Sequence, residues 1–418
     1  MTIPLIPRSF PISIPERLRL LARSLRRVIE TSIMTFMIIG PGRILSWYYH
    51  RKQQRGEKIM LRSKHAPVAA LSTDRQAQID PKTKVPPRKS KIMKHESYPK
   101  TEYGFAFDIV PLSGNMINGL GETTKRPPTP ILFHVTGKDS QGWDVLQEYL
   151  RIGHLSLRLL RSMLYVQWIG YEKTGPLAPI QHPIADPAEM TDQVKATARD
   201  LGAILVGITE LQPTHIFAGA DVPYRYAISC AVPMDREEML HAPSAETGEA
   251  IFDAYAAASA ISIELARRIR ALGWGAVSSS GVLDKAEIAH LPIAIDAGLG
   301  QLGKHGSLIT KEYGSNVRLG TVLTNLPLVV DAPVDIGVED FCVSCQICTT
   351  NCPPQAIFDT KQMVRGAEKW YVNFDTCIPY FAEHHACGIC IEVCPWSEEG
   401  RGVGISQKML EKRAQQPQ

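Results

Sequence analysis

The chain has 418 residues, of which 44% are hydrophobic and 21% charged, a composition typical of a globular protein with two or three domains. Nine cysteines are too few for a disulfide scaffold, and eight of them fall between residues 342 and 394, which indicates thiols kept reduced in a cytosolic setting. The net charge of +4 conceals an asymmetry, because residues 1–100 carry 21 Lys and Arg against 6 Asp and Glu, whereas residues 101–418 carry 25 against 36.

Residues 1–100 form a basic leader. The stretch PERLRLLARSLRRVIE (15–30) predicts a basic amphipathic helix, and the uncharged residues 31–42 are too few to cross a bilayer about 30 Å thick. We therefore expect residues 15–50 to lie on a membrane surface or to dock as a helix pair, with residues 61–100 as a linker. A basic segment can also bind RNA or DNA, but no zinc, homeodomain or RNA-recognition signature accompanies it, so nucleic acid is not the expected partner.

Residues 101–335 are expected to form a core in which helices and strands alternate. Helices are predicted at 141–152, 155–168, the first part of 187–211 and 246–274, and strands at 203–208, 224–234, 274–280 and 315–328. This alternation favours an α/β or α+β fold. The stretch GLGQLG (298–303) has the form G-x-G-x-x-G, but no strand closely precedes it, so we do not predict a dinucleotide site.

The clustered cysteines predict iron–sulfur ligands. CVSCQICTTNCPP (342–354) has the C-x2-C-x2-C-x3-C-P spacing of bacterial ferredoxins, in which the last Cys of each run ligates the other cluster. That rule gives a first set with the following members: Cys342, Cys345, Cys348 and Cys394. Zinc sites seldom show this spacing. We therefore predict a ferredoxin-like domain with two [4Fe-4S] clusters at 336–400, followed by a tail at 401–418.

The second cluster needs a fourth ligand besides Cys352, Cys387 and Cys390. An ordinary ferredoxin would supply it three residues before Cys387, where this chain has His384. Cys377 is the alternative, because a nine-residue loop can fold back to the site. We favour Cys377, since it has no other evident role and histidine ligation of such a cluster is uncommon.

Three blocks of sequence resemble the superfamily of reductive dehalogenases and epoxyqueuosine reductases. These blocks are LPIAIDAGLGQLGKHGSLITKEYGSNVRLGTVLTNLPL (291–328), CVSCQICTTNCPPQAI and CIPYFAEHHACGICIEVCPW. The resemblance implies a nitroreductase-like α/β core that binds a corrinoid next to two [4Fe-4S] clusters. It also implies base-off cobalamin without a protein His on cobalt. The chain is compatible with this, because it lacks the D-x-H-x-x-G corrinoid motif.

The resemblance also implies site residues. VSSSGVLDK (277–285) is similar to the stretch that carries the catalytic Asp of epoxyqueuosine reductases, but Ser278 stands in its place, which favours the dehalogenase branch. In that branch a Tyr donates a proton beside a basic residue, and the matching positions are Tyr255 with either Arg318 or Lys304. Further cofactor contacts are expected at these residues: Ser278, Gly298, Gly300 and His305.

These observations predict a corrinoid- and iron–sulfur-dependent oxidoreductase that replaces halogen by hydrogen with two electrons and a proton. Its expected partners are an organohalide and an external electron donor such as a ferredoxin, flavodoxin or reductase. The expected location is the cytoplasm, with possible attachment to the inner membrane surface. The alternatives are an epoxyqueuosine reductase-like enzyme acting on tRNA, whose phosphates the basic leader would suit, and a ferredoxin-like electron carrier without corrinoid.

Overall fold

The computed structural model describes residues 113–130, 156–279 and 287–415, all within the unit formed by Val85–Gln418. The predicted leader and linker (1–100) and the helix predicted at 141–152 lie outside the described residues. In the described part of the chain, no helix is both long and apolar enough to span a bilayer.

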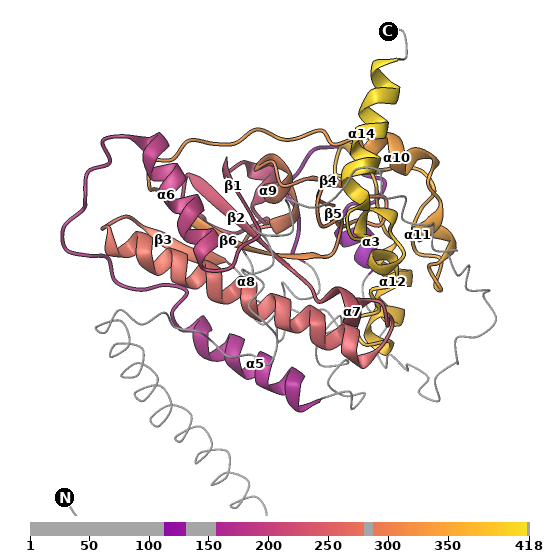
Figure 1. Cartoon of the computed structure of the whole chain (residues 1–418), viewed down its shortest axis with the longest axis horizontal. Helices are drawn as coiled ribbons and strands as arrows, with labels where there is room; N and C mark the ends of the chain where they lie inside the picture. Colours follow the sequence, from indigo (N-terminus) through magenta and orange to yellow (C-terminus); the bar gives the residue numbers. More distant parts are fainter. Residues whose placement is uncertain (1–112, 131–155, 280–286, 416–418) are drawn as a thin grey trace, which may run out of the picture. The chain divides into compact units, whose positions relative to one another are not determined.

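The core is built on a four-stranded antiparallel sheet with the order β1-β2-β6-β3 (Figure 1). Its strands are β1 (Leu205–Glu210), β2 (Tyr226–Pro233), β3 (Ala276–Ser279) and β6 (Val317–Thr324). All four lie where the sequence predicts strands. The central strand β2 is buried along almost its whole length, which shows that both faces of the sheet are covered.

Helices cover the two faces of the sheet. The long helix α8 (Ala245–Ala271) begins at the N-cap Ser244, whose hydroxyl accepts a hydrogen bond from the Thr247 amide, and packs against β2, β3 and β6. Helix α6 (Pro187–Asp200) flanks α8 and β1, and the short α9 (His290–Asp296) contacts β1, β2 and β6. Even-numbered residues of β2 such as Ile228 join the core under α8, and odd-numbered ones join the α9 side. The predicted mixed α/β core is therefore confirmed.

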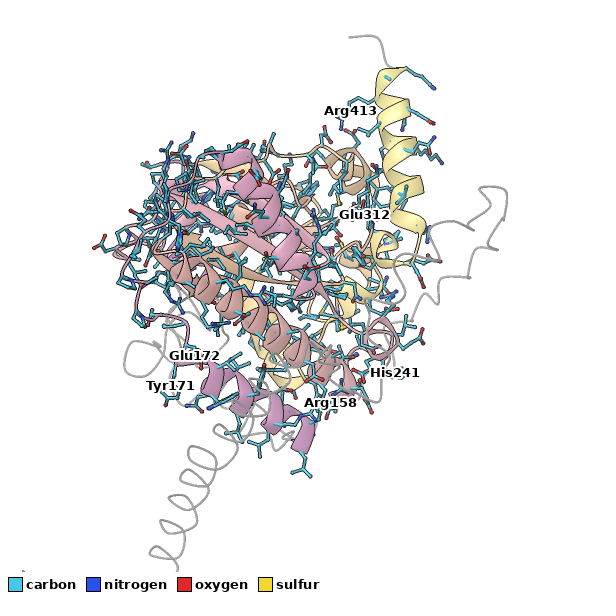
Figure 2. The ribbon with its side chains drawn as sticks, turned by 60° about the vertical axis from the view of Figure 1, so that its left-hand side comes forward. Arg158, Tyr171, Glu172, His241, Glu312 and Arg413 are labelled. Carbon is cyan, nitrogen blue, oxygen red and sulfur yellow. The ribbon has the colours of Figure 1, made fainter. Side chains whose placement is uncertain are left out.

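Helix α5 (Leu157–Gly170) packs on the outside of α8 (Figure 1). It corresponds to the helix predicted at 155–168. Arg158 lies near its start (Figure 2). Its guanidinium pairs with Glu238 at 2.6 Å, Asp253 at 2.8 Å and Glu249 at 3.3 Å. One guanidinium thus ties α5 to α8 and to the short helix α7 (Arg236–Met239).

The C-terminal part consists of short elements that follow the cysteine runs. They are α10 (Val338–Ser344), α11 (Ile347–Thr350), the hairpin β7 (Gln362–Val364) and β8 (Ala367–Lys369), α12 (Phe374–Glu383), α13 (Ile389–Glu392) and the 3-10 turn η5 (Pro395–Ser397). The predicted tail contains a helix, α14 (Arg401–Ala414), which packs on α10. Helix α3 (Gly114–Ile117) contacts α12, and the Ser113 hydroxyl and Gly114 amide both donate to Asp375.

Candidate functional site: two thiol sets and the cavity beside them

The first predicted cysteine set lines one small cavity. Cys342 and Cys345 lie at the end of α10, Cys348 lies in α11, and Cys394 precedes η5. All four face the same space, together with Ile309 and Trp396, the latter fully buried. The structure therefore brings Cys394 to the early run, as the crossed ligation of ferredoxins requires.

The second set gathers around α12 and the turn that follows it. Cys377 lies in α12, and the chain then reverses through four successive residues with positive φ, His385 to Gly388, which carry Cys387 back toward it. Positive φ is uncommon for residues other than glycine and is tolerated where the surroundings fix it. Burial raises the pKa of Cys377 to about 12, and the neighbouring thiols of Cys387 and Cys352 add to the effect. Burial raises the pKa of Cys390 well above its usual value, and the neighbouring thiols of Cys387 and Cys377 add to the effect.

The first thiol set has the number of ligands that a [4Fe-4S] cluster needs. Over residues 113–130, 156–279 and 287–415, no three His, Cys, Asp or Glu side chains surround one point closely enough to hold a lone metal ion. In a [4Fe-4S] cluster each iron takes one protein thiolate, so four thiols lie around a larger group. The first set, whose four thiols line one small cavity, meets this requirement.

The His384 side chain contacts Tyr380. Its ring stacks on Tyr380 with the centroids 3.8 Å apart, and its Nδ1 lies 2.9 Å from the Tyr380 carbonyl oxygen. Because the carbonyl can only accept, Nδ1 carries a proton and only Nε2 could bind a metal. Cys377 is favoured as the fourth member of the second set because its thiol lies near those of Cys387 and Cys352.

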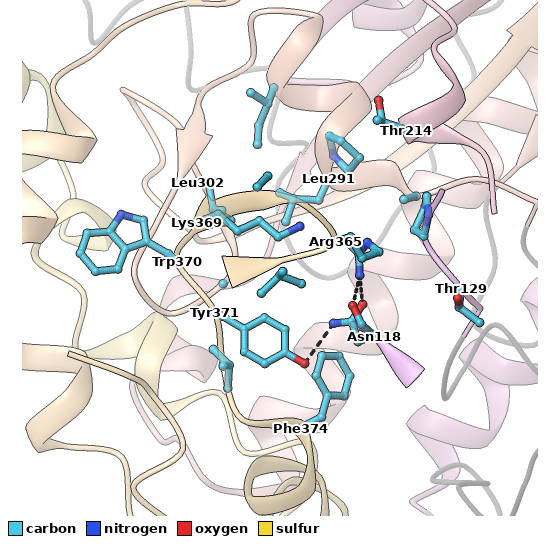
Figure 3. Close-up of a pocket in the computed structure, with 18 of the residues that line it drawn as sticks. Asn118, Thr129, Thr214, Leu291, Leu302, Arg365, Lys369, Trp370, Tyr371 and Phe374 are labelled. Atoms are coloured by element: carbon cyan, nitrogen blue, oxygen red, sulfur yellow. Dashed lines mark hydrogen bonds between the residues drawn. The ribbon is translucent and has the colours of Figure 1, made fainter. Parts of the chain in front are cut away.

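A large cavity lies next to the second set. Its volume is about 700 Å³, within the range of cofactor sites. One wall comes from the core at Thr214, Phe217 and α9, and the opposite wall comes from the hairpin and α12 (Figure 3). Cys377 is part of that second wall. A cluster held by the second set would therefore stand directly beside whatever fills the cavity.

His305 lies between the two spaces. It lines both the large cavity and the small cavity of the first set. Its Nδ1 accepts from the Ser307 amide at 3.2 Å, so Nε2 carries the proton and donates to the Ser315 hydroxyl at 3.0 Å. Burial lowers the pKa of His305 to about 4, which keeps the ring neutral at physiological pH. The expected contact with a cofactor is thus compatible with its position.

Tyr255 and Arg318 meet across α8 and β6. The Arg318 guanidinium carbon lies 5.3 Å from the centre of the Tyr255 ring, which is a cation–π contact. One Arg318 nitrogen donates to the Val317 carbonyl, while its Nε is buried without a hydrogen-bond partner among the described residues. Neither residue is among the described residues that line the large cavity.

Lys304 is placed elsewhere. It is 1% exposed, its Nζ donates to the Cys345 carbonyl at 2.8 Å, and it lies 4.9 Å from the centre of the Trp370 ring. It therefore lines the cavity of the first cysteine set. Of the two expected basic partners of Tyr255, the structure brings only Arg318 to it.

The other three expected cofactor contacts lie in packed surroundings. The Ser278 hydroxyl, 2% exposed, lies 2.9 Å from the Ser262 hydroxyl between α8 and the sheet. Gly298 has φ +78°, and a Cβ on Gly300 would come within 2.1 Å of the Ile309 carbonyl oxygen. Both glycines are therefore explained by backbone geometry. The structure does not bring Ser278, Gly298 or Gly300 to the lining of the large cavity described here.

Several residues of the large cavity were not predicted. Arg126, Arg365 and Lys369 contribute positive charge to its wall, and Asn118 fixes Arg365 through its backbone and side-chain oxygens (Figure 3). They come from two segments about 240 residues apart in sequence. No spacing or composition signal connects these segments, so only the fold reveals the group.

Comparison with known proteins agrees with this geometry. Residues 341–397 match the 4Fe-4S dicluster domain. The tetrachloroethene reductive dehalogenase of Sulfurospirillum multivorans is 30% identical over 260 residues, which cover 51% of each chain. The epoxyqueuosine reductase of Lactococcus garvieae is 32% identical over 148 residues, covering 32% of this chain and 39% of that protein. The chain thus spans about half the length, or less, of these curated relatives.

Solved structures support the fold. A catabolic reductive dehalogenase matches with a TM-score of 0.59 and 24% identity, covering 73% of this chain and 46% of that one. This likeness confirms the expected fold, an α/β core joined to a ferredoxin-like dicluster part. The chain is therefore similar in sequence to reductive dehalogenases and epoxyqueuosine reductases, and its fold resembles that of a solved reductive dehalogenase.

Proposed function

We propose that the chain is a corrinoid- and iron–sulfur-dependent reductive dehalogenase. The reaction takes an organohalide, two electrons and a proton, breaks the carbon–halogen bond, forms a carbon–hydrogen bond and releases halide. The observation that carries the proposal is the position of Cys377, which belongs to the second thiol set and also lines the large cavity. A redox centre at the wall of a cofactor-sized cavity can deliver electrons into it.

The proposed cofactors are two [4Fe-4S] clusters and a base-off cobalamin. The first cluster would take Cys342, Cys345, Cys348 and Cys394, and the second would take these residues: Cys352, Cys377, Cys387 and Cys390. A solved structure of the same fold is that of a B12-dependent reductive dehalogenase. The apolar walls of the cavity suit a flat macrocycle, which when bound supplies the cobalt chemistry that breaks the carbon–halogen bond.

Tyr255 and Arg318 are the proposed proton-handling pair. The two side chains are in cation–π contact between α8 and β6. Arg318 also has a buried Nε without a partner among the described residues, which could donate to an anion such as the departing halide. Lys304 is proposed instead to stabilise the first cluster electrostatically, because its buried ammonium group lies beside the first thiol set.

The substrate and partners are proposed by analogy with relatives. One dehalogenase of this fold was crystallised with 3-bromo-4-hydroxybenzoic acid, so an aromatic organohalide is a reasonable first substrate. An external ferredoxin, flavodoxin or reductase would supply electrons. We propose a cytoplasmic location, with residues 15–50 resting on the inner membrane surface, and the domain division predicted above: leader 1–100, core 101–335, cluster domain 336–400 and tail 401–418.

An epoxyqueuosine reductase-like activity on tRNA is the second candidate. It is favoured by the sequence similarity to the Lactococcus garvieae enzyme. Ser278 argues against this activity. It stands at the position expected for the catalytic Asp, and its hydroxyl lies in the core beside Ser262. A serine cannot serve as a carboxylic acid in proton transfer.

Anaerobic reconstitution of the full chain tests the proposal. With iron, sulfide and hydroxocobalamin we expect about eight iron and about one cobalt per chain, because each cluster holds four iron atoms. With reduced methyl viologen and 3-bromo-4-hydroxybenzoate, bromide and the debrominated acid should appear together. A chain that binds iron but shows no cobalamin absorption would contradict the proposal and favour an electron carrier. Restoration of queuosine in cells lacking the reductase would favour the second candidate.

A further inference from the structure

Three cationic side chains meet at one end of the large cavity. Arg126 lies in the segment 113–130, Arg365 lies in the turn between β7 and β8, and Lys369 ends β8. Figure 3 shows Arg365 and Lys369 directed toward the same part of the cavity. Two sequence-distant segments thus place like charges together on a wall that is otherwise largely apolar.

The positive charge is only partly balanced. Arg126 pairs with Glu122 at 2.6 Å, whereas Arg365 donates to the backbone and side-chain oxygens of Asn118, which carry no net charge. Within the described residues, no carboxylate lies within ion-pair distance of Lys369 or Arg365. Burial and the neighbouring charge of Arg126 lower the pKa of Arg365, and the carboxylate of Glu122 offsets this only in part.

Burial and the neighbouring Arg365 lower the pKa of Lys369 to about 8. A lysine is destabilised in this way when its charge has lost water and has gained no carboxylate in return. Such an arrangement is costly for the empty protein, and a bound anion would offset the cost. These charges therefore lower the stability of the empty protein, and their arrangement is that of a ligand-binding wall.

We infer that Arg365, Lys369 and Arg126 form an oxyanion site for a phosphate or carboxylate carried by the molecule in the cavity. Asn118 orients the guanidinium of Arg365, and its own side-chain amide donates to the Tyr371 hydroxyl at 3.2 Å. A guanidinium held in this way is pre-organised for a two-point contact with an oxyanion, and the Lys369 ammonium adds up to three donors. This inference rests on the proposed function, because it assumes that a corrinoid or an organohalide enters the cavity.

Two ligands could bring the oxyanion. One is the phosphodiester in the nucleotide tail of a corrinoid, and the other is the carboxylate of an acidic substrate. In either case the site fixes the ligand at a defined end of the cavity. Lys369 and Cys377 both line that cavity, so anchoring at the cationic end sets how the remainder of the ligand lies relative to the second thiol set.

The test compares matched ligands on matched variants. Lys369→Met removes the charge and keeps a long apolar side chain. Lys361→Met is the control, because Lys361 pairs with Glu339 at 2.6 Å and is not among the described cavity-lining residues. Both variants are made in the full, cluster-reconstituted chain. Iron content and melting temperature establish that each variant is folded.

The first arm measures dissociation constants for cobalamin and for cobinamide, which has the same ring but lacks the phosphodiester. We expect Lys369→Met to weaken cobalamin binding by about tenfold or more and to leave cobinamide binding unchanged. The second arm measures 3-bromo-4-hydroxybenzoate against 2-bromophenol, which lacks the carboxylate. A loss confined to the acid would assign the oxyanion to the substrate.

The outcomes separate this inference from the proposed function. A variant that binds all four ligands as tightly as the unaltered chain overturns the oxyanion site while leaving the corrinoid proposal standing. Equal weakening of cobalamin and cobinamide, with equal weakening of both bromophenols, also overturns it, because the charge would then have only a structural effect. An unaltered chain that binds no corrinoid refutes the proposed function, and the inference fails with it.

Discussion

The choice between Cys377 and His384 as the last ligand of the second cluster can be decided by iron content. Replacing Cys377 with Ala removes one of four thiolates, so the second cluster should lose one iron atom or all four. The expected iron content of the reconstituted protein falls from about eight to between about four and about seven per chain. His384→Ala should keep about eight, because a second cluster ligated by Cys377 retains all four of its thiolates.

The assay is iron and sulfide analysis of anaerobically reconstituted protein, followed by electron paramagnetic resonance of the dithionite-reduced form. The unaltered chain should show two interacting reduced clusters. Cys377→Ala should show one reduced cluster without that interaction. A three-iron remnant would give its signal in the oxidised sample, before dithionite is added. His384→Ala should retain the pattern of the unaltered chain. The reasoning is refuted if His384→Ala loses the second cluster while Cys377→Ala keeps all of its iron.

Other substitutions give further expected outcomes. Tyr255→Phe should lower turnover by about 10²- to 10⁴-fold with iron content unchanged, and Arg318→Met should do the same, as dye-linked kinetics would show. Arg158→Met should lower unfolding free energy by about 1–2 kcal/mol, visible as a lower melting temperature, because its three carboxylates are only partly buried. Cobalamin affinity should fall about tenfold per pH unit above about pH 8. The reason is that Lys369 of the empty site loses its proton there, whereas a bound oxyanion favours the protonated lysine. In Lys369→Met the affinity should not change with pH over this range.

The regular elements of the core could be predicted because their signals are local. Helix α8 has an apolar face, a capping serine and a glycine just beyond its end, and β2 is a short apolar run between polar turns. The strand order β1-β2-β6-β3 could not be predicted, since it depends on pairings between residues about 90 positions apart, such as Ile228 with Val322. The tail helix α14 was also not predicted, and it is held by packing on α10 and by Arg413 on Asp340.

One part of the candidate site could be predicted from the sequence and another part could not. The two proposed cysteine sets could be predicted from their spacing, because each ligand run is short and its geometry repeats from protein to protein. Lys304 lies one residue from His305, yet the structure directs it to the first thiol set and away from Tyr255. Which way a buried side chain points depends on the tertiary packing of the loop that carries it, and the sequence of GLGQLGK does not reveal it.

The unusual C-x9-C spacing acquires a physical meaning from α12 and the left-handed turn after it. In the ordinary spacing the ligand would come from position 384, and here that position lies against Tyr380. The longer spacing allows the ligand to come from inside α12, whose Cys377 and Phe381 both line the large cavity. The four positive φ values at 385–388 then return the chain to the second thiol set. In the proposed ligation, the C-x9-C spacing therefore places one ligand of the second cluster at the cavity wall, where it would shorten the path for an electron from that cluster to a cofactor bound in the cavity.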